Sequence, residues 1–423
     1  MNLSPPRGTQ DLLPPDSGRF AVLYDRASRL AELYGYARVE TPTFDQTELF
    51  ARSSGATSDV VAKEMYTFED RGGRDIALRP EGTASVMRAY LNKAGELGAP
   101  FKAYYLERMY RYDRPQAGRY REHRQFGLEV IGAEEPAADT EVIAVGDAYL
   151  RELGLSHYEL QINSIGDATC RPAYREELLA YLEANRDRMT DEHRDRFREN
   201  PLRVLDCKDQ ACRAIAADAP KMVDRLCDAC REHFDGVLAG LEEEGVKAVL
   251  SPTLVRGLDY YTRTAFEFVS LALTQAQVAL FAGGRYDGLA EVLGGPPTPG
   301  VGYGMGLERV LLAVAEEGVD PPVAAGLDCF VVAFGEDPWR WASHVASRLR
   351  GSGLRTGRPF GVRSMKAQFR MADRSGATFA VVVGQREFEE GQVTVRRLAD
   401  GEEQTLDLAA AVEWIDEELR SAR

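Results

Sequence analysis

Alternating hydrophobic and polar positions mark two long strands in the first third of the chain. Residues Lys102–Met109 and Gln125–Ile131 alternate in this way and are rich in aromatic or branched side chains. The segment between them is polar, and its Pro115 and Gly118 favour turns. The pattern therefore predicts two antiparallel strands joined by a long loop. A loop of this length inside a compact domain is usually functional.

Apolar residues recur at helical spacing elsewhere in the first half of the chain. A helix is predicted from Asp16, which can cap it, to Gly35, which ends it. A second amphipathic helix is predicted over Ala138–Leu153. The stretches at residues 79–83 and 302–309 each predict a strand that leads into a helix.

The pattern changes twice towards the C-terminus. It becomes helical and highly charged at about residues 167–248, which predicts a helical insertion within a strand-rich domain of residues 1–325. A Pro-rich segment at residues 320–322 then suggests a linker. Beyond it strands and helices alternate, which predicts a small α/β domain with a mixed sheet at residues 326–423.

Composition indicates a soluble globular protein of two or three domains. The chain has 423 residues, 44% of them hydrophobic, and a net charge of −15. No apolar run approaches a transmembrane span and the N-terminus has no signal-peptide pattern, so a cytoplasmic location is expected, with no membrane partner. The negative charge argues against general nucleic-acid coating, and no DNA partner is expected.

One segment of this acidic chain is basic. Arg340–Arg397 contains twelve Lys or Arg against four Asp or Glu. A local excess of this kind is typical of an RNA-binding surface. The alternative is chance surface charge.

The loop between the two long strands is also basic. It and its flanks carry five arginines: Arg111, Arg114, Arg119, Arg121 and Arg124. Arg binds phosphate through two hydrogen bonds and keeps its charge, so the cluster predicts a phosphate site. The alternative is a solvated hairpin in which Glu107, Asp113 and Glu122 pair with the arginines, and charge alone does not separate the two.

Three other places carry candidate chemistry. Glu81 and Thr83 lie where a strand meets a helix, so they either cap the helix or direct a carboxylate at the amino group of a ligand. Arg309 is expected near a helix N-terminus, where the helix dipole favours anions. Tyr260 and Tyr261 are adjacent in a predicted strand, so only one of them is expected to face a site. An ordinary half-buried strand is the alternative there.

Four of the six cysteines form two pairs in the sequence: Cys207, Cys212, Cys227 and Cys230. Paired thiolates at short spacing suit tetrahedral zinc. The first pair is loosely spaced, however, and both lie in segments with a helical pattern. Buried or free thiols are therefore favoured, and no metal site is predicted.

Together these segments resemble the histidyl-tRNA synthetase family, class II aminoacyl-tRNA synthetases, over essentially the whole chain. The three class II motifs correspond to the helix–strand unit ending at Pro42, the strand–loop–strand of residues 111–129 and GMGLERV at 304–310. Two further stretches, LVRGLDYY at 254–261 and GGRYDGL at 283–289, match histidine-specific signatures of the family. This joint match favours the phosphate interpretation of the basic loop.

The resemblance implies an α/β fold of α+β type. It consists of a catalytic domain with an antiparallel sheet flanked by helices and a helical insertion, followed by a C-terminal α/β anticodon-binding domain with a mixed sheet. It also implies a homodimer. The implied enzyme activates L-histidine with ATP and Mg²⁺ to histidyl-adenylate and pyrophosphate. It then transfers histidine to the 3′-terminal adenosine of tRNA(His).

The resemblance implies roles for the residues of the nucleotide site. Arg111 would contact the α-phosphate of ATP and Arg309 the γ-phosphate. Arg256 would approach the α-phosphate and the histidine carboxylate from the other side. His123 stands where the family most often has Phe, at a position expected to stack on adenine.

The resemblance also implies roles in binding histidine. The matching positions are Glu81, Thr83, Gln125, Glu129, Tyr260 and Tyr261. Of these, Glu81 and Thr83 would bind the α-amino group, while Glu129 and Tyr261 would contact the two imidazole nitrogens.

The tRNA acceptor end would approach a third group of residues on the basic loop, which are Arg114, Gln116 and Arg119.

Three competing interpretations follow from the same residues. A catalytically inactive, histidine-sensing regulatory subunit of ATP phosphoribosyltransferase would resemble this family, but typically lacks the C-terminal domain and the Arg of LVRGLDYY, both of which this chain has. The histidine-specific stretches argue against a class II synthetase for proline, threonine or glycine. A zinc-dependent structural protein is the most distant alternative.

Overall fold

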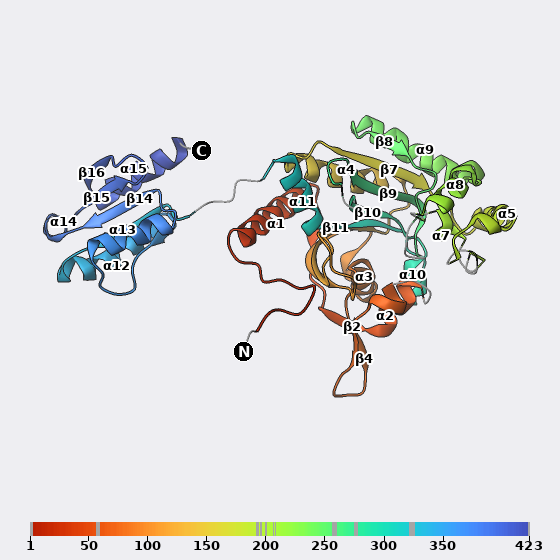
Figure 1. The fold of residues 1–423 in the computed structure, drawn as a ribbon, viewed down its shortest axis with the longest axis horizontal. Coiled ribbons are helices and arrows are strands. Elements are labelled where there is room, and N and C mark those ends of the chain that lie inside the picture. Colours follow the sequence, from red (N-terminus) through yellow and green to blue (C-terminus); the bar gives the residue numbers. More distant parts are fainter. Residues whose placement is uncertain are drawn as a thin grey trace. The chain divides into compact units, whose positions relative to one another are not determined.

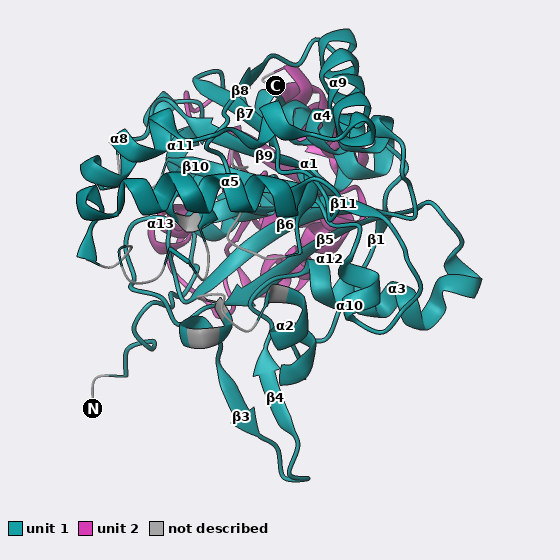
Figure 2. Cartoon of the chain, turned by 90° about the vertical axis from the view of Figure 1, so that its right-hand side faces the viewer, with its two compact units in different colours: residues 1–321 teal, residues 322–423 magenta. Residues whose placement is uncertain are grey.

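The computed structural model describes residues 3–55, 60–191, 194, 197–198, 201–205, 207, 209–255, 260–274, 278–320 and 326–421. The chain separates into two compact units, Met1–Pro321 and Pro322–Arg423 (Figure 2). Arg256 and the predicted domain boundary at residue 325 lie outside the described residues. None of the helices in the described ranges is long and apolar enough to cross a membrane.

A large sheet forms the centre of the first unit (Figure 1). Its eight strands lie in the order β1 (Ala37–Arg38), β5 (Phe101–Tyr110), β6 (Glu122–Ile131), β11 (Gly300–Gly306), β10 (Ala279–Arg285), β9 (Thr262–Ser270), β7 (Tyr158–Ser164) and β8 (Ala248–Leu250). The inner neighbours are antiparallel, and only the edge pairs β1–β5 and β7–β8 are parallel. The predicted pair of long strands is confirmed as β5 and β6.

One face of this sheet is covered by helices. They are α1 (Asp16–Leu33), α4 (Pro136–Glu152), α9 (Asp228–Glu243) and α11 (Leu307–Glu317). Phe126 and Leu128 of β6 and Tyr303 and Met305 of β11 are buried in the core beneath them. Because side chains alternate along a strand, the residues next to these four along β6 and β11 face the other side of the sheet.

The opposite face carries a different set of elements. They are β2 (Phe44–Gln46), α2 (Thr47–Ser54), η1 (Val60–Glu64), β3 (Thr67–Glu69), β4 (Asp75–Leu78), α3 (Thr83–Leu97) and α10 (Leu289–Val292). The short strands form a separate antiparallel sheet in the order β2-β4-β3. Val86 and Met87 of α3 pack against Tyr105 of β5, which places the N-terminus of α3 over the sheet.

The segment between β7 and β8 is helical, as predicted. Its elements before α9 are α5 (Arg171–Ala184), η2 (Arg186–Arg188), α7 (Leu202–Leu205), α8 (Gln210–Asp218) and η3 (Met222–Arg225). They share a small apolar core of their own. The four cysteines considered as one zinc site do not meet in space, because Cys227 and Cys230 lie with Cys170 and Asp167, while Cys207 and Cys212 lie apart from that group.

The second unit has the mixed sheet predicted for it. The strand order is β13 (Thr356–Gly357), β12 (Cys329–Ala333), β14 (Phe379–Val383), β15 (Gln392–Arg397) and β16 (Glu403–Asp407). Strands β13, β12 and β14 are parallel to one another, and the pairs β14–β15 and β15–β16 are antiparallel. The helices are α12 (Glu336–Gly351), α13 (Met365–Arg374), α14 (Gln385–Glu390) and α15 (Leu408–Ser421).

A fully buried ion pair joins β10 to α4. The guanidinium of Arg285 is hydrogen-bonded to Asp139, to Asp287 at 3.1 Å and to the carbonyl oxygen of Ala133 at 2.9 Å. Burial opposes the ionisation of Asp139, but His233 and Arg285 outweigh it and hold the pKa of this carboxyl below its usual range. The Arg of the GGRYDGL stretch therefore supports the fold.

We expect Arg285→Ala to destabilise the first unit by about 3–5 kcal/mol, because it takes the guanidinium away from the fully buried carboxylate of Asp139. The measurement is the midpoint of urea unfolding followed by circular dichroism. Arg52→Ala is the matched control, since Arg52 pairs with Glu48 on an exposed helical surface and is worth at most about 1 kcal/mol. Equal shifts in the two variants would contradict the expectation.

Candidate active site

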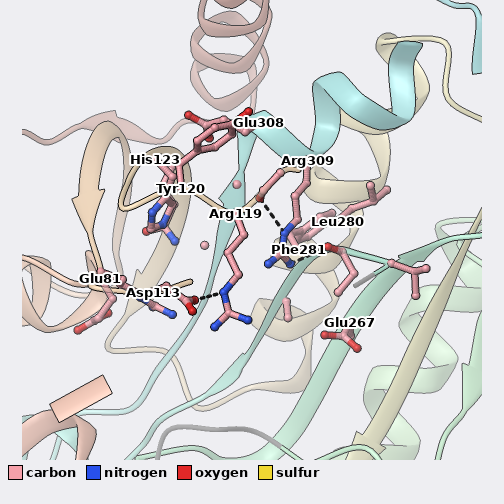
Figure 3. A pocket seen from close by; sticks show the side chains of 18 of the residues that line it. Glu81, Asp113, Arg119, Tyr120, His123, Glu267, Leu280, Phe281, Glu308 and Arg309 are labelled. Carbon is pink, nitrogen blue, oxygen red and sulfur yellow. Dashed lines mark hydrogen bonds and ion pairs between the residues drawn. The ribbon is translucent and has the colours of Figure 1, made fainter. Parts of the chain in front are cut away.

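A cavity of about 500 Å³ opens on the face of the sheet opposite α1 and α4. Strand register explains its composition. In β6 and β11, Gly127 pairs with Gly304 and Glu129 with Gly302, while Ala282 of β10 also pairs with Gly304. These residues share one face, and the β5–β6 loop and the N-terminus of α3 close the sides (Figure 3).

Most residues predicted for the site line this cavity: Glu81, Thr83, Arg111, Arg119, His123, Gln125, Tyr260, Tyr261 and Arg309. Glu129 is fully buried directly behind the wall. Arg114 and Gln116 are exposed on the β5–β6 loop and are not among the described residues that line the cavity. The roles implied for all these residues remain predictions.

Three arginines make one end of the cavity cationic. Arg309 donates to the carbonyl oxygens of Gly118 at 3.3 Å and Ala279 at 3.0 Å, and Arg111 donates to that of Pro80 at 2.8 Å. Arg119 pairs with Asp113 (Figure 3). Burial, reinforced by the neighbouring arginines, lowers the pKa of Arg309, which shows that these charges repel. An anion of several charges would relieve that repulsion.

Two further arginines of the basic segment, Arg121 and Arg124, support the fold and are not among the described residues that line the cavity. Arg124 is buried and pairs with Glu308 of α11 at 3.1 Å. The guanidinium of Arg121 lies over the ring of Tyr112, 3.8 Å from its centre. Of the partners expected in the salt-bridged interpretation, Asp113 pairs with Arg119, whereas Glu107 and Glu122 pair with Arg79 and Arg108 outside the loop. The phosphate interpretation remains a prediction.

Gly118 allows the loop to approach α11. Its φ of +70° is one that L side chains rarely adopt, and a Cβ there would lie 2.8 Å from Leu312 and 3.1 Å from Arg309. The close approach lets the carbonyl oxygen of Gly118 orient Arg309.

A buried network of hydroxyl and carboxyl groups forms the other end of the site. Glu129 accepts hydrogen bonds from Tyr286 and, at 2.7 Å, from the hydroxyl of Thr83. The hydroxyl of Tyr105 lies 3.4 Å from both Glu129 and Gln125. Burial raises the pKa of Glu129 to about 8. Near neutral pH this carboxyl can therefore hold or release a proton at little cost.

Sequence reasoning missed some of these groups. Tyr286 donates a hydrogen bond to Glu129, and no role was predicted for it although it is the Tyr of the GGRYDGL stretch. Tyr105, Glu267 and Arg213 also line the cavity. Arg213 comes from α8 in the helical segment, which only the three-dimensional fold brings to the site.

Glycines of β11 make space for the polar side chains. A Cβ on Gly302 would lie 1.8 Å from a carboxylate oxygen of Glu129, and one on Gly304 would lie 2.3 Å from the amide nitrogen of Gln125. Both side chains therefore lie flat across the neighbouring strand. Any larger residue at either position would displace them.

The expectation that only one of Tyr260 and Tyr261 faces the site is wrong. Both line the cavity, with ring centres 4.6 Å apart. They precede β9 and are not part of it, so the alternation of a strand does not apply to them.

Glu81 caps helix α3, which was the alternative considered for it. Its carboxylate accepts hydrogen bonds from the backbone N–H of Thr83 at 2.8 Å and of Ala84 at 3.0 Å. It also lines the cavity, so capping fixes its position without removing it from the site.

His123 is a neutral ring beside the cationic end. Burial, aided by Arg111, Arg309 and Arg119, lowers its pKa to about 3. An uncharged, flat ring is suited to stacking on another flat ring.

Comparison with known proteins places this geometry in context. A family model described as histidyl-tRNA synthetase matches residues 8–310, and one described as anticodon binding domain matches residues 328–418. The histidine–tRNA ligase of Halothermothrix orenii is 46% identical over 414 residues, covering 98% of this chain and 99% of its own. That of Rhodococcus erythropolis is 48% identical over 411 residues, covering 97% and 96%.

Solved structures agree in fold. The apo histidyl-tRNA synthetase of S. aureus has 37% identity and a TM-score of 0.82, covering 98% of this chain and 100% of its own. A Bacillus halodurans protein described as an ATP phosphoribosyltransferase regulatory subunit/histidyl-tRNA synthetase has 21% identity and a TM-score of 0.65 over 91% of this chain and 99% of its own, so it shows the fold alone.

The raised pKa of Glu129 predicts a pH-dependent stability. Between the ordinary carboxyl pKa and about 8 the folded state holds a proton that the unfolded state has released, so stability falls as pH rises through this range and levels above it. At about 1.4 kcal/mol per pKa unit, the fall amounts to a few kcal/mol. Glu129→Gln removes this contribution.

We therefore expect the stability of Glu129→Gln relative to wild type to increase with pH up to about 8. The measurement is the urea unfolding midpoint from pH 5 to 9. Glu316→Gln, at an exposed glutamate of α11, is the control and gives no such trend. A difference between Glu129→Gln and wild type that is constant with pH would contradict the expectation.

Proposed function

The chain belongs to the histidyl-tRNA synthetase family and acts as a histidine–tRNA ligase, and we propose that both steps of this reaction take place in the cavity described above. The observation that carries the proposal is the two-ended cavity. One end is lined by Arg111, Arg119 and Arg309, and the other is backed by the buried network around Glu129. A triphosphate suits the first end and a polar amino acid the second.

In the first step the carboxylate of histidine attacks the α-phosphorus of ATP. A carboxyl oxygen–phosphorus bond forms, the bond to the bridging oxygen breaks, and pyrophosphate leaves with the electron pair. This chemistry needs positioning and neutralisation of negative charge, not a protein nucleophile. Arg111 faces the α-phosphate and Arg309 the γ-phosphate in this proposal, and Arg256 approaches the reacting carboxylate.

Recognition of histidine follows from the polar end. Neutral imidazole has one donor and one acceptor nitrogen, and Glu129 and Tyr261 answer them, with Gln125 beside the amino acid. Because Glu129 also accepts from Tyr286 and Thr83, its orientation is set before the ligand arrives. A site whose buried polar groups need partners rejects apolar amino acids strongly.

The other ligands of the site have matching groups. Glu81 and Thr83 meet the α-amino group of histidine, with Tyr260 packed beside Tyr261. His123 offers its neutral ring to the adenine base.

Mg²⁺ fits the same cavity. The ion takes oxygen ligands and is typically held by one or two carboxylates together with substrate phosphates. Glu267 of β9 meets this requirement, because its carboxylate faces the space around Arg119 and Arg309 (Figure 3). Bound there, Mg²⁺ would neutralise part of the triphosphate charge.

In the second step a ribose hydroxyl of the terminal adenosine of tRNA attacks the histidyl carbonyl, and AMP leaves. The acceptor end approaches along the exposed loop that carries Arg114, Gln116 and Arg119.

We assign residues 1–325 to catalysis, with the insertion at about 167–248, and residues 326–423 to anticodon binding. We also propose a cytoplasmic homodimer.

The second unit presents a surface suited to single-stranded RNA. Phe360 is 99% exposed and Val362 is 76% exposed, and the basic residues Arg358, Arg363 and Lys366 lie beside them in sequence. An exposed aromatic ring among cations is the arrangement on which unpaired bases stack. This segment is our candidate for anticodon contact.

Histidine-dependent ATP–pyrophosphate exchange tests the first step. We expect exchange with histidine and with no other amino acid, and a fall of about 10²–10³-fold in Arg309→Ala, because a charge-stabilising group is removed. Arg256→Ala and Glu129→Ala should likewise collapse exchange. Arg108→Ala, at an exposed arginine of β5 paired with Glu122, is the control and retains exchange. Histidine binding without exchange in wild type would support the regulatory-subunit alternative instead.

Aminoacylation of tRNA(His) tests the second unit. Loss of one stacked base costs about 1–3 kcal/mol, so Phe360→Ala is expected to raise the KM for tRNA roughly 10- to 100-fold. Phe360→Trp keeps a stacking surface and should restore most of the affinity. Exchange, which needs no tRNA, is the internal reference. An unchanged KM in Phe360→Ala would remove this segment from the RNA-binding surface.

A further inference from the structure

Three cysteines and one aspartate meet where the helical segment leaves the central sheet. Asp167 follows β7, Cys170 directly precedes α5, and Cys227 and Cys230 lie at the start of α9. The four potential ligand atoms all lie within 4.8 Å of one another. We propose that these residues form a structural zinc site, which is independent of the activity proposed above.

The separations match tetrahedral zinc. With Zn–S near 2.3 Å and Zn–O near 2.0 Å, a tetrahedron has S···S edges of about 3.8 Å and S···O edges of about 3.5 Å. The sulfurs of Cys170 and Cys230 are 3.8 Å apart, and the sulfur of Cys170 is 3.5 Å from a carboxylate oxygen of Asp167. These two separations are those of ligands that share one tetrahedral zinc ion, and none of the others exceeds 4.8 Å.

The surroundings orient the ligands. The backbone N–H of Thr169 donates to the Asp167 carboxylate at 2.9 Å, and that of Asp167 donates to the Cys170 sulfur at 3.4 Å. Cys170 and Cys227 occupy the N-cap positions of α5 and α9, at the positive ends of the helix dipoles. Such outer contacts are typical of built metal sites.

Gly166 gives the cluster its room. It has a φ of +64°, and a Cβ there would lie 2.7 Å from the Cys170 sulfur. Three thiolates and one carboxylate favour zinc over magnesium or calcium, which prefer oxygen ligands. All four protein ligands are present, which is typical of structural and not catalytic zinc.

The cluster is tied to the active site through backbone hydrogen bonds. The N–H of Ile165 donates to the carbonyl oxygen of Arg263 at 2.7 Å, and that of Arg263 donates to Gly166 at 2.8 Å. The Arg171 guanidinium donates to the carbonyl oxygen of Tyr261. A zinc ion would therefore hold the loop that supports Tyr261, a residue lining the cavity.

Metal content of the full chain tests the site directly. The protein is purified under reducing conditions, incubated with zinc sulfate, freed of excess metal and analysed by mass spectrometry. We expect about one zinc ion per chain. Cys227→Ser should lose it, and Cys207→Ser, in the same helical segment but outside the cluster, should keep it.

A variant that gains a ligand distinguishes loss of a zinc ligand from misfolding of the protein. Asp167→Cys completes a four-thiolate set, so we expect it to keep the zinc. Its Co²⁺ form should show stronger sulfur-to-metal charge-transfer absorption than wild type, because one more thiolate is bound. Zinc-free wild type, a Cys170–Cys230 disulfide in the reduced preparation, zinc that follows Cys207 instead of Cys227, or no spectral gain in Asp167→Cys would each overturn the proposal.

Discussion

The alternation of side chains along β6 is the constraint on which the first unit depends. Phe126 and Leu128 are buried under the helices, so Gln125 and Glu129 must face the opposite side of the sheet. A slip of one residue would place the Glu129 carboxylate in the apolar core and turn Phe126 into the cavity. Burial of the core therefore fixes the register, and the register determines which residues of the neighbouring strands meet at the site.

Buried ion pairs fix the positions of α4 and α11 relative to the strands, which the strand register alone does not determine. Arg124 at the start of β6 pairs with Glu308 at the start of α11, and Arg285 at the end of β10 pairs with Asp139 of α4. Such pairs add little net stability, but leaving one charge unpaired costs several kcal/mol. Arrangements that separate the partners are therefore scarcely populated. As a result α11, which begins beside the cavity and carries Arg309, keeps one position relative to the basic loop.

Local patterns in the sequence were sufficient for the strands, the helices and the basic loop, because alternation and helical spacing depend on near neighbours. They were insufficient where partners are distant. Nothing near Glu129 in sequence identifies Tyr286 as its partner, and nothing near Cys227 and Cys230 in sequence identifies Asp167 and Cys170 as their neighbours in space. The orientation of Tyr260 and Tyr261 was predicted wrongly, because strand β9 begins at Thr262, directly after them, and strand alternation does not apply to either residue.

The segment around Tyr261 is held from two sides, and this links the helical insertion to substrate binding. On one side the ring lies against β10, where a Cβ on Gly284 would be 2.9 Å from it. On the other side the loop from Ile165 to Arg171 binds the backbone of residues 261 and 263. Arg263 has a φ of +50°, a conformation that persists only when its surroundings enforce it. A change at Cys170 that makes the helical insertion more mobile would therefore remove this restraint on the backbone. The position of Tyr261 would then change, although no residue that lines the cavity had been substituted.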